Sequence, residues 1–206
     1  MNSTEHIAII VFWAIFGVFH SVLAAPGVKR KAAMAMGRYY DWYRPLYSIF
    51  AFITTALVLV YPFTIESVQL WPTNTGLQVL FALPAIAGLV VMGISIRKYF
   101  FRLSGIQVLY KKQEQPVLER DGLHSYVRHP LYGGTLLFAW SVFFIFPMLS
   151  YLLTCAGITA YTLIGIKLEE KKLQNLFGQQ YRAYKNNVPM IIPFTKFGRV
   201  SKPLSD

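Results

Sequence analysis

Long apolar runs separated by polar, basic segments dominate this chain. Five of these runs approach or reach the length needed to cross about 30 Å of hydrocarbon at about 1.5 Å per helical residue. Pro84 lies inside the third run, where a membrane helix tolerates proline as a kink rather than a break. We therefore predict five transmembrane helices, at residues 7–25, 46–63, 77–96, 131–146 and 149–166.

The last two runs are separated only by Pro147 and Met148, so they must form a tight helical hairpin. After them, apolar residues continue at helical spacing among Lys and Gln, which predicts an amphipathic helix interrupted at Gly178. Pro189 then begins a segment that cannot be helix interior. The prediction is one all-α membrane domain with polar parts at residues 97–132 and 167–194.

The composition supports a membrane protein. The 206 residues are 55% hydrophobic and 14% charged, with a mean hydropathy of +0.43. A soluble domain of this size could not bury so much apolar surface, whereas a bilayer accepts it. The first run is longer than the core of a signal peptide and no Lys or Arg precedes it, so we expect a retained helix. The single Cys155 excludes a disulfide within the chain.

The basic residues are confined to alternate polar segments. Of twenty Lys and Arg, five follow the first run in what we interpret as a basic loop at residues 28–44, seven follow the third run, and eight lie in the tail. The positive-inside rule then predicts an outside N-terminus and a cytoplasmic C-terminus. The net charge of +11 is thus a topology signal that also attracts anionic lipid, and we exclude nucleic-acid binding. We expect an integral protein of the bacterial cytoplasmic membrane whose site faces the cytoplasm.

One polar cluster stands where the fourth run begins, as Gly122-Leu-His-Ser-Tyr-Val-Arg-His-Pro-Leu-Tyr-Gly-Gly134. Each residue has a structural reading: Pro130 suits a first helical turn, and His129 or Ser125 could cap it. Together they indicate more, because the glycines allow close backbone approach and a helix N-terminus beside Arg128 suits a carboxylate.

Glu169 and Glu170 follow the last predicted span, at its cytoplasmic end. Adjacent acids at a helix C-terminus repel each other and oppose the helix dipole, so they need cations nearby. The neighbouring lysines could simply solvate them. The hairpin, however, brings them to the same membrane face as Arg128.

These residues resemble a known family. The first motif, followed by Glu169-Glu170-x-x-Leu173-x-x-x-Phe177-Gly178-x-x-Tyr181-x-x-Tyr184-x-x-x-Val188-Pro189-x-x-Ile192-Pro193, is similar to integral-membrane methyltransferases that use S-adenosylmethionine. These include isoprenylcysteine carboxyl methyltransferase and phospholipid N-methyltransferases, and the likeness covers residues 105–194. The N-terminal half, with His20-Ser-x-Leu-Ala, Val28-Lys and Tyr43-Arg-x-x-Tyr47, is similar to NnrU-like and methanethiol S-methyltransferase-like proteins.

The resemblance implies S-adenosylmethionine as cofactor and assigns its contacts. Carboxylates and aromatic rings suit its ammonium, ribose and sulfonium groups. Arg128, with Glu170 as its partner, would act at the reacting centre by positioning or charge compensation, and no metal ligand is assigned. The cofactor would be held by His129, Pro130, Leu131 and Tyr132 from one side and Glu169 from the other, with Pro116, Val117, Leu118, Glu119 and His124 closing over it and Gln107 as a looser candidate.

The methyl acceptor is less defined. Isoprenylcysteine enzymes have an Arg four residues before the first Glu, and this chain has Gly165 there. That departure favours a small or lipophilic thiol, entering from the bilayer, over isoprenylcysteine carboxyl or phospholipid N-methylation. Either His124 or His129 could serve as base. His20 is expected to face the bundle interior or to make an interhelical hydrogen bond. Two other readings stay open: an NADPH-dependent membrane reductase, and a non-catalytic membrane scaffold.

Overall fold

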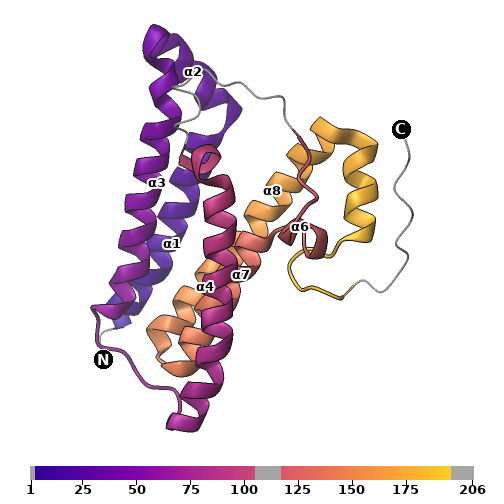
Figure 1. Ribbon diagram of the computed structural model, residues 1–206. Helices are drawn as coiled ribbons and strands as arrows, with labels where there is room; N and C mark the ends of the chain where they lie inside the picture. The colour runs from indigo at the N-terminus through magenta and orange to yellow at the C-terminus, as the bar shows by residue number, and fades with distance from the viewer. Residues whose placement is uncertain (1–2, 105–116, 196–206) are drawn as a thin grey trace.

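The computed structural model describes residues 3–104 and 117–195, which form helices and one isolated β-bridge. The principal helices build an elongated bundle, and α6 and the C-terminal part of α8 lie at its side (Figure 1). The elements are α1 (Ser3–Ala24), α2 (Pro26–Met36), the 3₁₀ helix η1 (Gly37–Trp42), α3 (Tyr43–Val60), the 3₁₀ helix η2 (Tyr61–Phe63), α4 (Thr75–Ser104), α6 (Leu123–Tyr126), α7 (Pro130–Ile145) and α8 (Leu149–Asn187).

The predicted apolar runs are helical, and four of the five lie in helices of membrane-spanning length. Within the described part of the chain, four helical segments are long and apolar enough to cross a membrane: Ser3–Ala24, Pro26–Phe63, Thr75–Lys98 and Leu149–Asn187. α7 is also apolar, but its 16 residues give a length of only about 24 Å. The all-helical membrane class is confirmed for the described residues, with α7 as a shorter apolar helix.

The predicted basic loop after the first span is wrong. α2 and η1 make that segment helical instead. Pro26 occupies the first turn of α2, where its missing N–H costs nothing, so it starts a helix rather than separating a helix from a loop. Gly37 then ends α2 with a positive φ of 49°. α4 also continues beyond its predicted end, while Pro84 lies inside it without breaking it.

The predicted α7–α8 hairpin is confirmed, and its tip is tied to two other parts of the chain. The Leu70 N–H donates to the Pro147 carbonyl at 2.8 Å, and the Leu149 N–H donates to the Val68 carbonyl at 2.9 Å. The Ser67 hydroxyl accepts from the Ser150 N–H at 2.8 Å and lies 3.0 Å from the His6 ring. This end of the bundle therefore joins α1, the segment before α4, and α8.

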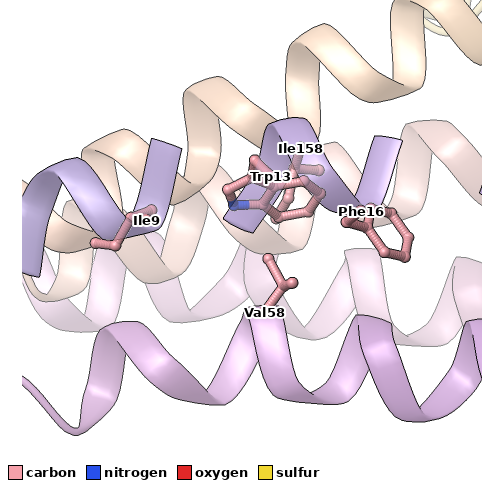
Figure 2. Packing of buried hydrophobic residues seen from close by; sticks show 5 residues of the cluster. All are labelled: Ile9, Trp13, Phe16, Val58 and Ile158. Atoms are coloured by element: carbon pink, nitrogen blue, oxygen red, sulfur yellow. The ribbon is translucent and has the colours of Figure 1, made fainter. Parts of the chain in front are cut away.

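A small apolar core joins α1, α3 and α8. It consists of Ile9, Trp13, Phe16, Val58 and Ile158 (Figure 2). Trp13 lies so close to Gly157 of α8 that a Cβ there would be 2.5 Å from the indole. Outside this core, large apolar side chains are exposed along α1, α3 and α4, as expected for helices that face lipid.

α4 and α7 approach each other through two glycines. A Cβ on Gly88 would lie 2.8 Å from both the Gly134 carbonyl oxygen and the Phe138 nitrogen. A Cβ on Gly134 would lie 2.9 Å from the Gly88 carbonyl oxygen. Small residues at such a crossing let two membrane helices pack backbone to backbone. The contact places the first turn of α7, which follows Arg128 and His129, firmly against α4.

Candidate active site

The Arg-His-Pro segment is held by the C-terminal tail. The Arg128 N–H donates to the Pro189 carbonyl at 2.9 Å, and the His129 N–H donates to the Met190 carbonyl at 3.0 Å. Residues 127–130 are all buried. The non-helical segment that Pro189 was predicted to begin therefore runs beside the motif, and the two stretches satisfy each other's backbone groups.

The start of α7 has a proline in its first turn, as predicted, but lacks the predicted side-chain cap within the described residues. Pro130 occupies the first turn after His129, and no side chain of the described residues caps this end of the helix. The Ser125 hydroxyl donates instead to the Gly122 carbonyl at 2.7 Å. A Cβ on Gly133 would lie 3.1 Å from the Ile191 side chain, so this glycine admits the tail. The His129 ring is left to make other contacts.

Arg128 and Glu170 form a buried ion pair, as the sequence predicts. The Arg128 Nε lies 2.8 Å from Glu170 Oε1 and its Nη2 lies 2.6 Å from the same oxygen. Its Nη1 donates to the carbonyls of Lys185, at 3.1 Å, and Val188. The two side chains are only 5% and 10% exposed. Charge-assisted bonds between groups so buried are strong and directional, and this pair fastens the tail onto the motif.

Lys185 completes the surroundings of Glu170. Its Nζ lies 2.6 Å from Glu170 Oε2, and His129 Nε2 lies 3.3 Å from Oε1. Lys185 was not among the site residues predicted from the sequence. One sequence signal could have indicated it: Lys185 lies between Tyr184 and Val188, two residues of the family motif at the C-terminal end of α8.

The lowered pKa of Glu170 predicts that the packing of the tail against the Arg-His-Pro segment is sensitive to acid. Burial alone would raise the pKa of Glu170, but the hydrogen bonds from Lys185 and Arg128 lower it from 4.5 to about 2. An acid with a depressed pKa stabilises the folded state above its unfolded value, and the contribution is lost as the pH falls toward 2. We expect the hydrogen-exchange protection of the 127–129 amides to fall markedly as the pH is lowered from about 4.5 toward 2.

Hydrogen exchange, corrected for the intrinsic rate at each pH, measures this loss in peptides that contain residues 127–129. Glu170→Gln should show weak protection that no longer depends on pH in this window. An equally steep acid loss in Glu170→Gln would contradict the assignment to this carboxyl.

His129 lies between the two predicted glutamates. Its Nδ1 is 3.8 Å from Glu169 Oε2, and its ring centroid is 5.8 Å from that of Tyr132. Burial lowers the pKa of His129 even though Glu169 and Glu170 act to raise it, which favours the neutral imidazole. The Glu169 side chain is 44% exposed. Glu169 is therefore the carboxylate that a ligand can reach, and Glu170 is the one already engaged.

The segment before the motif is anchored next to the tail. Glu119 pairs with Lys98 of α4 at 3.0 Å, and the His124 carbonyl accepts a hydrogen bond of 2.6 Å from the Tyr184 hydroxyl. Burial and then Lys98 lower the pKa of His124. Val117 is exposed and Leu118 is half-buried. The two remaining predicted residues of this side, Gln107 and Pro116, lie outside the described residues.

The rings of His20 on α1, Tyr47 and Tyr161 lie close together inside the bundle. The His20 ring lies 5.1 Å from that of Tyr47 on α3 and 5.7 Å from that of Tyr161 on α8. The Tyr47 hydroxyl donates to the His20 carbonyl at 3.3 Å. Buried His20 Nδ1 has no hydrogen-bond partner among the described residues. His20 thus faces the interior, and its ring does not make the alternative interhelical hydrogen bond within the described part.

Comparison with known sequences decides the family. The sequence profile described as NnrU protein matches residues 8–196, which is most of the chain. The chain belongs to the NnrU family. The likeness to NnrU-like proteins predicted from the N-terminal motifs is thereby confirmed.

This NnrU family member is also similar to named methyltransferases. It is 30% identical over 206 residues to methanethiol S-methyltransferase 1 of Bradyrhizobium diazoefficiens, covering 95% of this chain and 70% of the relative. Methanethiol S-methyltransferase of Crocosphaera subtropica is 29% identical, with 87% and 71% covered. Protein-S-isoprenylcysteine O-methyltransferase of Saccharomyces cerevisiae is 31% identical over 113 residues, with 52% and 46% covered. No solved structure matches the chain significantly.

Proposed function

We propose that this protein is a membrane methyltransferase that transfers the methyl group of S-adenosylmethionine to a thiol or another lipophilic acceptor. The observation that carries the proposal is the likeness to proteins named methanethiol S-methyltransferase over most of both chains. The site supports it, because an accessible carboxylate, Glu169, lies beside the rings of His129 and Tyr132.

The residues around Glu169 fit the proposed cofactor chemically. S-adenosylmethionine supplies an electrophilic methyl group on a cationic sulfur and presents an ammonium and ribose hydroxyls. Glu169 accepts hydrogen bonds from the ammonium or the ribose, and the His129 and Tyr132 rings flank the cationic or adenine part. Val117, Leu118, Glu119 and His124 close the site from the α6 side, and Pro130 and Leu131 form the wall at the start of α7.

Arg128 and Glu170 act in this proposal as positioning residues. Their side chains are buried and engaged with each other and with the tail carbonyls. They hold the tail across the start of α7, and this fixes the wall against which donor and acceptor align. Methyl transfer depends mainly on such alignment, at about 3–3.5 Å, and on the exclusion of water.

The acceptor reaches the site from the bilayer side of the bundle. A thiol must lose its proton to become nucleophilic, and neutral imidazoles can take that proton. Burial favours that form for His129, which lies at the cofactor side, and His20 Nδ1 has no hydrogen-bond partner among the described residues. Gly165, in place of the arginine of isoprenylcysteine enzymes, argues for a thiol without a carboxylate.

The proposed orientation has five spans, with α7 as the short fourth, the N-terminus outside and the site in the cytoplasm of a bacterial cell. The confinement of all Lys and Arg to alternate polar segments supports it. A membrane-impermeant maleimide should label Ser3→Cys but not Asn187→Cys in intact cells. Labelling of Asn187→Cys alone would reverse the orientation.

Cofactor binding tests the function directly. We expect the purified protein to bind S-adenosylmethionine, and not NADPH, in calorimetric titrations. Glu169→Gln should weaken binding about 10- to 100-fold, because a hydrogen bond to a charged group contributes about 1.5–3 kcal/mol. Radiolabelled cofactor offered with methanethiol, longer thiols, prenylcysteine and phospholipid then identifies the acceptor.

Glu66→Gln is the matched control, since this exposed glutamate lies in the segment before α4, far along the chain from the site. It should bind the cofactor like the unmodified protein. Binding of NADPH alone would overturn the proposal in favour of a reductase, and binding of neither cofactor would favour a non-catalytic scaffold.

A further inference from the structure

A pocket beside Glu170 is lined by residues of α8 on both sides of Gly178. Gly178 adopts a non-helical conformation, with φ 50° and ψ −120°, and so bends α8 between its two ends. The bend is visible near the C-terminal end of the ribbon (Figure 1). The pocket is about 460 Å³ in volume, and it is lined by Lys167, Glu170, Lys171, Gln174, Asn175, Arg182 and Lys185.

The charges of this pocket are unbalanced. It has four cationic side chains and one carboxylate, and that carboxylate is already paired with Arg128 and Lys185. Lys167, Lys171 and Arg182 make no hydrogen bond or ion pair with another described residue. Like charges gathered around one hollow repel one another unless an anion lies between them. The pocket therefore favours an anionic ligand.

An apolar surface leads from the membrane to this pocket. Ile164 and Leu168 are each 58% exposed. They stand four residues apart on α8, and Lys171 follows Leu168 by three, so the three side chains share one helix face. A ligand on this face meets apolar side chains first and cationic ones next. This order matches an amphiphile whose tails lie in the bilayer and whose headgroup is anionic.

We propose that the pocket binds the phosphate headgroup of an anionic phospholipid, whose acyl chains lie along Ile164 and Leu168. Basic pockets beside membrane helices on the cytoplasmic side bind such headgroups. Glu169, His129 and Tyr132 do not line the pocket, so lipid and cofactor occupy separate sites. The inference does not depend on the methyl transfer, and its test requires no cofactor.

Lipid titration of the purified full chain in detergent tests the site. Native mass spectrometry should detect one saturable site for short-chain phosphatidylglycerol and none for phosphatidylcholine. Lys167→Gln/Lys171→Gln/Arg182→Gln should weaken that site at least 10-fold, and Ile164→Gln/Leu168→Gln should weaken it with all charges intact. Inorganic phosphate should compete at least 10-fold more weakly than the lipid.

The matched control is Arg30→Gln/Lys31→Gln/Arg38→Gln in α2 and η1, which removes the same charge at exposed positions that do not line the pocket. An equal loss of binding in this control would overturn the proposal, because the attraction would then be diffuse. Competition by inorganic phosphate as strong as that of the lipid would also overturn it, in favour of a free-phosphate site. Gel filtration and circular dichroism show whether each variant is folded, and the single Lys171→Gln variant gives a smaller loss if the triple variant is not.

Discussion

Arg128→Ala is expected to detach the tail from the start of α7 and to lower the free energy of unfolding by about 3–5 kcal/mol. The substitution leaves the buried Glu170 carboxylate with Lys185 as its remaining strong cationic partner. It also removes the donor to the carbonyls of Lys185 and Val188. Removing one partner of a buried pair is far more costly than replacing both, because the other charge stays desolvated.

Thermal unfolding in detergent and limited proteolysis of the tail measure this effect. Arg128→Lys should be intermediate, since a single ammonium cannot reproduce the guanidinium's fork of donors. Cofactor affinity of the folded fraction should fall as well, because the tail borders the proposed site. Arg182→Ala is the control, because the Arg182 side chain is exposed and lies three residues before Lys185 on α8. Its free energy of unfolding is expected to change by no more than about 0.5 kcal/mol. Similar losses for Arg128→Ala and Arg182→Ala would show that the buried pair does not hold the tail.

Gly88→Ala is expected to force α4 and α7 apart. The new Cβ would lie 2.8 Å from two backbone atoms of α7, the Gly134 oxygen and the Phe138 nitrogen. Backbone atoms cannot turn away as a flexible side chain can, so the helices themselves must move. Overpacking of this kind costs about 1–3 kcal/mol and occasionally more, and we expect the upper part of that range.

Gly93→Ala is the matched control on the same helix, because no described atom outside the local helix backbone lies within 4 Å of its added Cβ. It should be neutral or stabilising by about 0.5–1 kcal/mol, the difference in helix propensity. Gly134→Ala should resemble Gly88→Ala, and the double variant should cost less than the two single losses together, since one separation of the helices relieves both clashes. Denaturant titrations of the reconstituted protein compare the four variants. Equal stability of Gly88→Ala and Gly93→Ala would mean that this crossing is not close-packed.

The sequence by itself was enough to predict the long apolar helices and the approach of the glutamate pair to Arg128. Long apolar runs must become helices in a membrane, because no other local structure satisfies every backbone group there. The hairpin at Pro147 and Met148 then brings Arg128 and the two adjacent glutamates to one end of an antiparallel pair, and the family resemblance named Glu170 as the partner of Arg128. The same reasoning failed after Pro26, where a proline and basic residues were interpreted as a loop although proline also suits the first turn of a helix.

Only the tertiary structure decided how differently the two glutamates are exposed. Glu169 and Glu170 are neighbours in sequence, but successive residues on a helix point about 100° apart, and the rotation of α8 against α7 is set by packing along the whole helix. That rotation turns Glu170 toward Arg128 and leaves Glu169 accessible. Three other features also required the tertiary structure. The contact of the tail with residues 128 and 129 and the helix crossing at Gly88 join positions far apart in the chain. The basic pocket depends on the bend at Gly178. The local periodicity of the sequence cannot predict such contacts, because it indicates which face of a helix is apolar but not which other part of the protein that face contacts.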